Sequence, residues 1–143
     1  MTEQLKPQIW VAAIIRKDGK VLLGKRLSKL WKETRALPGW KLEYHEDIIT
    51  CAEREIKEEC WIEIQHAKII ATTNEKHPSS HRITFFVLWD YKNWKVTIRE
   101  AKKCEKREWF EWEHLPSPLF LGLKNLYSTD FHPFKNAIPT FTT

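Results

Sequence analysis

The chain has 143 residues, of which 42% are hydrophobic, and its formal net charge at pH 7 is +5. This length predicts one soluble domain; no apolar run approaches the roughly 18 residues of a membrane span, and residues 1–6 lack the apolar core of an export signal. Lys and Arg are scattered rather than gathered into one stripe, which argues against nucleic-acid binding, although the positive charge suits anionic nucleotides.

The first predicted elements form a β-hairpin. Residues 9–16 are a near-continuous apolar run rich in Ala, Ile and Val, which is typical of a buried strand. Residues 17–20 read Lys-Asp-Gly-Lys, a strong turn signal, and residues 21–25 supply the returning strand. A polar loop that ends in Pro-Gly is expected over residues 27–38.

A helix is predicted from about Asp47 to Cys60. Glu53 and Lys57 are expected to face solvent. The apolar residues are spaced to form one inward stripe, and they are Ile48, Ile49, Ala52, Ile56 and Cys60.

Glu55, Glu58 and Glu59 lie at positions i, i+3 and i+4 of this helix, so three carboxylates share one face beside the apolar stripe. Like charges at this spacing repel, and the helix dipole disfavours anions in the last turn. Because both effects are unfavourable, the cluster predicts a cation that compensates the negative charge. Ligands that offer only oxygen atoms favour Mg²⁺ or Mn²⁺. The alternative interpretation is an ordinary solvated face.

The second half of the chain predicts mainly strands. An exposed loop is expected over residues 74–81, and a tight turn is expected at Asn93-Trp94. Residues 115–127 are typical of a closing amphipathic helix with two prolines near its start. The strand-like segments are residues 62–73, 82–91, 95–98 and 108–112.

The helix and the loop before it resemble the sequence box of the Nudix hydrolase family, G-x5-E-x7-R-E-U-x-E-E-x-G-U, where U is a bulky aliphatic residue. Weaker similarity to small MutT-like members covers about residues 8–127. Seven of the nine defined positions match at the required spacing: Glu46, Arg54, Glu55, Ile56, Glu58, Glu59 and Ile62.

The resemblance implies a fold that the pattern alone does not specify. Alternating strands and helices predict only a mixed α/β protein. The family implies an α/β/α sandwich with a mixed sheet, in a single domain over residues 1–143. Its core would span about residues 8–127, with residues 128–143 as a C-terminal tail.

The resemblance also implies a metal site. Glu58 and Glu59 would be the main ligands of Mg²⁺ or Mn²⁺. Glu55 would bind a second ion or help to activate the attacking water. The backbone carbonyl of Trp40 would lie near the metal.

Other residues would position the helix or bind substrate. Arg54 and Glu46 are expected to pair and to hold the helix against the loop. Arg26 is a candidate for phosphate binding, Glu43 for a further acidic contact and Trp112 for stacking on a nucleobase. Their alternatives are a surface cation, an exposed loop carboxylate and a core aromatic residue.

These features predict Mg²⁺-dependent hydrolysis of a phosphoanhydride bond in a nucleoside diphosphate derivative. A nucleoside triphosphate, released as monophosphate and pyrophosphate, is the preferred substrate, and ADP-ribose or another nucleotide sugar is the nearest alternative. A catalytically silent Nudix-like domain that binds a nucleotide is a further alternative. Analogy with the family also allows a homodimer.

The cysteines predict the compartment. Cys51, Cys60 and Cys104 are odd in number and lack the spacing of a zinc site. Reduced, buried thiols are therefore expected, which indicates a cytoplasmic protein.

Both mismatches to the family box hold Trp where the family has Gly, at positions 40 and 61. The chain has only 4 Gly but 8 Trp. We hypothesise that some of these codons are UGA, which one genetic code reads as Trp and another as Gly; UGG codons would contradict this. The alternative is true divergence with a distorted loop and an inactive enzyme. The Trp residues concerned are Trp10, Trp31, Trp40, Trp61 and Trp94.

Overall fold

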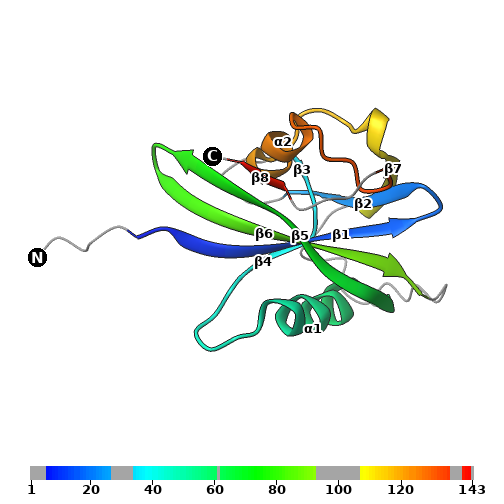
Figure 1. Cartoon of the computed structure of the whole chain (residues 1–143), viewed down its shortest axis with the longest axis horizontal. Coiled ribbons are helices and arrows are strands. Elements are labelled where there is room, and N and C mark those ends of the chain that lie inside the picture. The colour runs from blue at the N-terminus through cyan, green and yellow to red at the C-terminus, as the bar shows by residue number, and fades with distance from the viewer. Residues whose placement is uncertain (1–5, 27–33, 61, 93–106, 136–139, 143) are drawn as a thin grey trace, which may run out of the picture.

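The computed structural model describes residues 6–26, 34–60, 62–92, 107–135 and 140–142. A mixed eight-stranded sheet lies between two helices (Figure 1). Helix α1 (Ile48–Cys60) covers one face and the shorter α2 (Leu121–Tyr127) lies over the other. The predicted α/β/α sandwich with a mixed sheet is confirmed.

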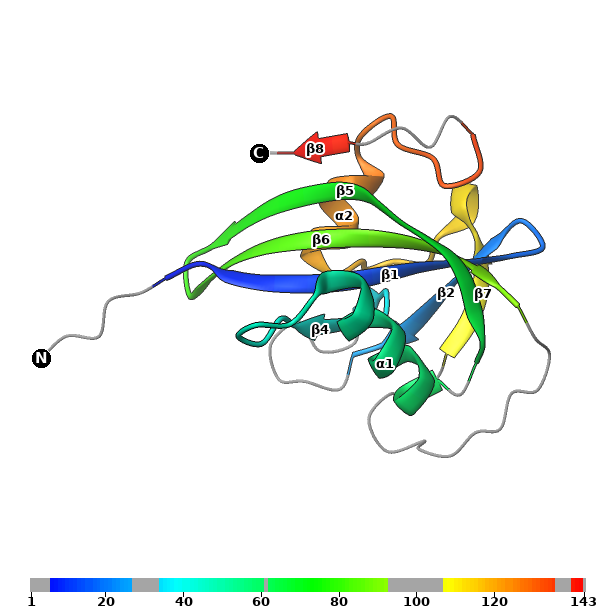
Figure 2. The ribbon, with the colours of Figure 1, turned by 60° about the horizontal axis from the view of Figure 1, so that its bottom comes forward.

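The strands follow the order β3-β2-β1-β6-β5-β8 across the sheet, while β4 pairs with β1 and β7 with β2 (Figure 2). The central pair β1 and β6 is parallel, β5 is antiparallel to β6, and β8 is parallel to β5. The bounds are β1 (Gln8–Lys17), β2 (Lys20–Lys25), β3 (Arg35–Ala36), β4 (Gly39–Lys41), β5 (Ile64–His77), β6 (Ser80–Tyr91), β7 (Arg107–Glu111), β8 (Thr140–Thr142), with a short 3₁₀ helix η1 (Trp112–His114).

The middle of strand β1, residues 9–15, is apolar because both of its faces are covered. Its side chains alternate, so that Val11, Ala13 and Ile15 join the core on the α1 side. Ala12 and Ile14 join the core on the α2 side. A strand buried on both faces reads as a continuous apolar run rather than an alternating one.

Each helix seals one of these two cores. Ala52 and Ile56 of α1 are fully buried and pack in the cluster that contains Trp89 of β6. Leu123 and Leu126 of α2 belong to the opposite cluster. The sheet is therefore held between two separate apolar layers.

One edge of β1 is shared by two different strands. β4 pairs with β1 at Trp10–Ala12, whereas β2 pairs with it at Arg16–Lys17. Between these two contacts, the backbone N–H of Ala13 donates to the carbonyl of Pro38 over 2.8 Å. The sheet forks at this point, and the fork places the cavity described below.

The predicted hairpin after β1 is confirmed. Asp18 and Gly19 both have positive φ, 49° and 76°, as the two central residues of a type I′ turn require. Asp and Gly tolerate this conformation better than other residues.

The predicted exposed loop over residues 74–81 is wrong. β5 continues to His77, which pairs with Ser80, so that only Pro78 and Ser79 form the turn. Thr73 and Glu75 are buried in alternation with more exposed neighbours, as a strand requires. The sequence analysis did not recognise this part of the strand, because a strand is expected to have apolar residues on its buried face and these residues are polar.

The closing helix starts later than predicted, at Leu121 instead of Leu115. Pro116 and Pro118 explain the delay, because a residue that precedes proline disfavours the helical conformation. The predicted strand over residues 108–112 is β7, although it ends at Glu111.

Several predictions fall outside the described residues, among them the turn at Asn93-Trp94 and the strand over residues 95–98. The predicted C-terminal tail contributes β8 to the sheet and, at Phe131, a buried side chain to the core on the α2 side. Neither helix in the described part of the chain has the length and hydropathy needed to cross a membrane.

Replacement of Ile56 by Ala should lower the free energy of unfolding by about 2–5 kcal/mol, because it leaves a cavity in a fully buried position. Urea denaturation would measure this loss. Lys57→Ala is the matched control on the exposed side of the same helix and should change stability by no more than about 0.5 kcal/mol. Equal effects of the two substitutions would contradict the assigned helix face.

Candidate active site on helix α1 and the adjoining cavity

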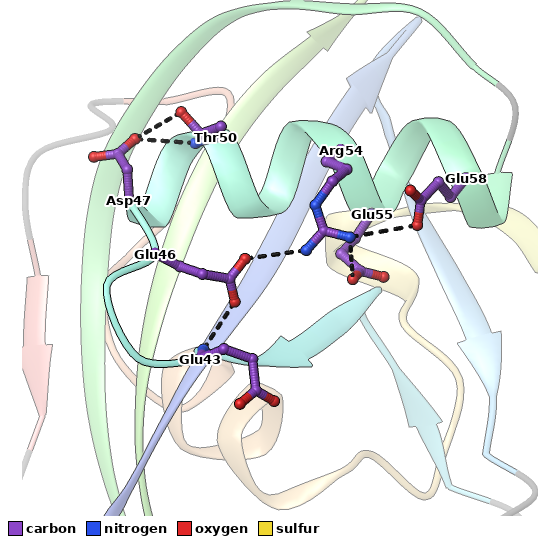
Figure 3. Close-up of polar contacts among 7 residues, drawn as sticks. All are labelled: Glu43, Glu46, Asp47, Thr50, Arg54, Glu55 and Glu58. Atoms are coloured by element: carbon purple, nitrogen blue, oxygen red, sulfur yellow. Dashed lines mark hydrogen bonds and ion pairs between the residues drawn. The ribbon is translucent and has the colours of Figure 1, made fainter.

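A capped turn fixes the start of α1. The Asp47 carboxylate accepts hydrogen bonds from the backbone N–H of Thr50 over 3.1 Å and from its hydroxyl over 3.0 Å (Figure 3). This side chain satisfies a backbone donor that the first helical turn leaves unpaired. His45 has a φ of 67°, and the turn closes with Glu46 N–H donating to the carbonyl of Glu43 over 3.1 Å.

Arg54 connects the acidic residues of this region (Figure 3). Its Nη2 lies 3.0 Å from Glu46 Oε2, and this pair, predicted from the sequence, is confirmed. Its Nη1 lies 3.0 Å from Glu55 Oε1 and 3.5 Å from Glu58 Oε2. One guanidinium therefore joins the loop to the helix and offsets the repulsion between two carboxylates on α1.

The loop lowers the pKa of Glu46. The main cause is the hydrogen bond that its carboxylate accepts from the backbone N–H of Glu43 over 2.8 Å, and the contact with Arg54 adds to it. The pKa of Arg54 is raised, chiefly by the hydrogen bond to Glu46. Both groups are thus held in their charged forms.

Burial raises the pKa of the neighbouring Cys51 thiol to about 11. Cys51 is 2% exposed, as the expectation of a buried, reduced thiol requires. This cysteine is protonated near neutral pH and is a poor nucleophile.

Glu59 faces a different arginine. Its Oε2 lies 3.6 Å from Nη2 of Arg107, which begins β7. Both side chains are about one-fifth exposed, so this pair is more sheltered than the contacts of Glu58, whose side chain is 60% exposed. Glu55, Glu58 and Glu59 are therefore divided between two arginines.

In this arrangement, no three His, Cys, Asp or Glu side chains of the described residues converge closely enough to hold a metal ion. The donor set nevertheless fits Mg²⁺ or Mn²⁺, because Glu55, Glu58 and Glu59 offer only carboxylate oxygens from one helix. The arginine contacts supply the positive charge that this cluster requires. A bound metal would have to draw the carboxylates away from Arg54 and Arg107.

A cavity of about 260 Å³ lies at the fork of the sheet. It is lined from the α1 side by Glu59 and from the α2 side by Gly122 and Leu123, so it spans the edge of β1 rather than one face of the sheet. Its wall carries four basic side chains, two acidic ones and three aromatic rings: Lys25, Arg26, Arg82, Arg107, Glu59, Glu75, Trp10, Phe86 and Phe120.

Two of the arginines stack on aromatic rings in this cavity. The guanidinium carbon of Arg26 lies 4.2 Å from the ring centre of Phe120, and that of Arg82 lies 4.0 Å from the ring centre of Trp10. Burial lowers the pKa of both arginines, and the charge of Arg82 lowers that of Arg26 further. Two such cations side by side favour an anionic ligand.

The three predicted substrate-binding residues have different outcomes. Arg26 lines the cavity. Glu43 is exposed in the loop before α1 and does not line the cavity. Trp112 is 4% exposed and packs against Tyr127 and Phe131, with ring centres 5.2 and 5.8 Å away. The predicted stacking of Trp112 on a base is therefore wrong, because the core already covers its ring.

Trp40 stands in β4 opposite Val11, and its side chain is 8% exposed in the core under α1. Its φ is not in the left-handed region, so the backbone does not demand Gly at this position. The indole Nε1 is nevertheless buried without a hydrogen-bond partner among the described residues. Pro38 and Gly39, just before it, line the cavity. Trp31, Trp61 and Trp94 lie outside the described residues.

Sequence reasoning missed several cavity residues because they are far apart in the chain. Glu75 and Arg82 fall in or beside the stretch that was expected to be a loop. Arg107 was not singled out, although it precedes the predicted aromatic strand. The alternation Thr73-x-Glu75 was the available signal for a buried polar strand face.

Comparison with known proteins identifies the family and relatives of this chain. The model of the NUDIX domain family matches residues 5–129. An ADP-ribose pyrophosphatase from Methanocaldococcus jannaschii is 29% identical over 118 residues, which cover 81% of this chain and 69% of that protein.

Solved structures share the fold. A MutT NUDIX hydrolase from Burkholderia pseudomallei superposes with a TM-score of 0.78 and 24% identity, covering 87% of this chain and 98% of that one. An ADP-ribose pyrophosphatase from Streptococcus suis has a TM-score of 0.65 and 18% identity, covering 96% and 100% of the two chains.

Replacement of Arg54 by Gln should raise the pKa of Glu46, which should still lie below its ordinary value because the Glu43 N–H bond remains. In the wild-type protein, the lowered pKa of Glu46 stabilises the fold at pH values above the pKa that Glu46 has in the unfolded chain. This stabilisation is lost as the pH falls through the pKa of Glu46 in the folded protein. Because the pKa is lowered less in the variant, the stability of the variant should decrease less in acid. NMR titration of the Glu46 carboxyl would measure the shift. Lys57 pairs with Glu53 and not with Glu46, so the control substitution Lys57→Gln should leave the pKa of Glu46 unchanged.

Replacement of Trp40 by Gly separates the two interpretations of that residue. If Trp40 is native, the loss of its buried ring should cost at least about 3–5 kcal/mol in urea denaturation. If the organism places Gly there, the variant should be as stable as the Trp form or more stable, and the gene should carry UGA at this codon. A UGG codon together with a destabilised variant would end the recoding hypothesis.

Proposed function

This chain belongs to the Nudix hydrolase family, and we propose that it uses Mg²⁺ or Mn²⁺ to hydrolyse a phosphoanhydride bond in a nucleoside diphosphate derivative. The preferred substrate is a nucleoside triphosphate, which yields the monophosphate and pyrophosphate. One observation carries the proposal. Glu59, from the acidic helix, lines the same cavity as four basic side chains and three aromatic rings.

That combination suits a nucleotide. Arginine and lysine attract phosphate oxygens, and arginine does so with paired N–H donors. Flat aromatic walls suit a base or a sugar face. A carboxylate helix beside them provides oxygen ligands for a hard cation at the phosphate end.

The residues have separate tasks in this proposal. Glu58 and Glu59 hold the metal, and Glu55 holds a second ion or takes a proton from the attacking water. A bound divalent ion would neutralise charge at the phosphate and lower the pKa of its water. Arg54 and Glu46 keep α1 against the loop that follows β4. We place the backbone carbonyl of Trp40, in β4, near the metal. Arg26, which lines the same cavity as Glu59, contacts phosphate.

A second substrate class is supported by the relatives. Two of the similar proteins, from M. jannaschii and S. suis, are named ADP-ribose pyrophosphatases. We therefore keep ADP-ribose and other nucleotide sugars as the alternative substrate. A domain that binds nucleotides without cleaving them is the remaining alternative, and the assays below separate it from an enzyme.

The cellular compartment and the oligomeric state are also proposals. We propose a cytoplasmic protein from the cysteine content, since the one described cysteine whose side chain is placed, Cys51, is a buried thiol. A homodimer is proposed by analogy with the family only.

Glu58→Gln and Glu59→Gln should each reduce metal-dependent hydrolysis roughly 100-fold or more, because a neutral amide is a poor ligand for a hard cation. Release of pyrophosphate or phosphate would be followed with Mg²⁺ and with Mn²⁺. Glu53→Gln is the matched control on the same helix, where Glu53 pairs with Lys57 and lies outside the cavity. Unchanged rates in both test variants would refute the metal assignment.

A substrate panel tests the reaction itself. Nucleoside triphosphates, ADP-ribose and UDP-sugars should be cleaved only when a divalent ion is present, and EDTA should stop turnover. Preference for a triphosphate would support the main proposal, and preference for ADP-ribose would support the alternative. A protein that binds these compounds with either metal but cleaves none of them would be a binding domain.

A further inference from the structure

The cavity holds a carboxyl group that does not come from the acidic helix. Glu75 of β5 lines the cavity although the residue is only 2% exposed. It lies against α2 so closely that a Cβ at Gly122 would stand 2.7 Å from its Oε1. Gly122 is therefore the residue that leaves room for this carboxyl, since any side chain there would displace it.

Neighbouring hydroxyl groups hold the carboxyl in place. Thr73 Oγ1 donates a hydrogen bond to Glu75 Oε2 over 2.8 Å, and the Thr84 hydroxyl is a second partner. Both threonines are buried. A carboxyl group has about four acceptor positions, so two hydroxyl donors leave capacity for a ligand.

The charge state of Glu75 does not remove this capacity. Burial raises the pKa of Glu75, while the two threonines and the charge of Arg82 oppose the increase. A carboxylate accepts hydrogen bonds at both oxygens, and a protonated carboxyl still accepts at its carbonyl oxygen. Glu75 is an acceptor in either form.

The rest of this part of the cavity is flat. The rings of Phe86 and Phe120 line it, and the planar guanidinium of Arg82 lies 5.4 Å from the ring centre of Phe120. Planar walls of this kind suit a planar heteroaromatic ring.

We propose that Glu75 determines base specificity by accepting a hydrogen bond from an exocyclic amino group of the substrate's nucleobase. The inference rests on the proposed nucleotide substrate. A base that presents a carbonyl at the same place would bring lone pairs against the Glu75 carboxylate, which has no proton to donate, so such bases are disfavoured. Arg26, which stacks on Phe120 and lines the same cavity, is left to contact the phosphates.

Binding of nucleoside monophosphates in EDTA tests this without turnover. Two matched pairs differ only in one amino group: AMP with purine riboside monophosphate, and GMP with IMP. Calorimetric titration of the wild-type protein should show, for at least one pair, about tenfold or stronger binding of the amino-bearing member. Equal affinities within both pairs would overturn the proposal.

Variants at Glu75 identify the residue responsible. Glu75→Leu should lower the affinity for the amino-bearing nucleotide to that of the matched nucleotide without the amino group. The affinity for the matched nucleotide should stay the same. Glu75→Gln keeps an acceptor oxygen and should retain most of the preference. If Glu75→Leu weakens both members equally, Glu75 is structural and the proposal fails.

Gly122→Ala provides an independent variant should Glu75→Leu fail to fold. Its methyl group should displace Glu75 Oε1 and reduce the amino preference, with circular dichroism as the check on folding. An unchanged preference in a folded Gly122→Ala protein with a displaced carboxyl would contradict the proposal. Preference for amino-bearing bases without any metal-dependent hydrolysis would instead leave Glu75 supported and refute the enzymatic function.

Discussion

The repulsion among carboxylates on one helix is the constraint around which the candidate site is arranged. Glu55 and Glu58 share Arg54, and Glu59 meets Arg107, so each of the three acids lies beside an arginine. Arg54 also reaches back to Glu46 in the loop. The same guanidinium therefore sets the position of the loop relative to α1, and a cation that entered the cluster would compete with contacts that already hold two segments together.

Local chemistry explains why part of this fold was predictable from the sequence. The hairpin at Asp18-Gly19 follows from residues that tolerate positive φ, and α1 follows from an apolar stripe behind a capping Asp47. The pairing of Arg54 with Glu46 follows from the family spacing. Each of these depends on residues close together in the chain, where spacing alone fixes geometry.

The cavity was not predictable in the same way, because the fold assembles it from distant residues. Arg26, Arg82 and Arg107 come from three separate strands or strand ends, and their scatter along the sequence concealed a local concentration of charge. Glu75 was hidden for another reason. A buried polar residue breaks the alternation by which a strand is recognised, and the hydrogen bonds from Thr73 and Thr84 offset the cost of burying this one.

The fork at β1 has a thermodynamic consequence. Because the cavity is bordered by Glu59 of one helix and by Gly122 of the other, an occupant touches both outer layers of the sandwich at once. Ligand binding stabilises whatever it contacts in the folded state. We therefore expect the amide hydrogens of both α1 and α2 to gain protection from exchange when the cavity is occupied.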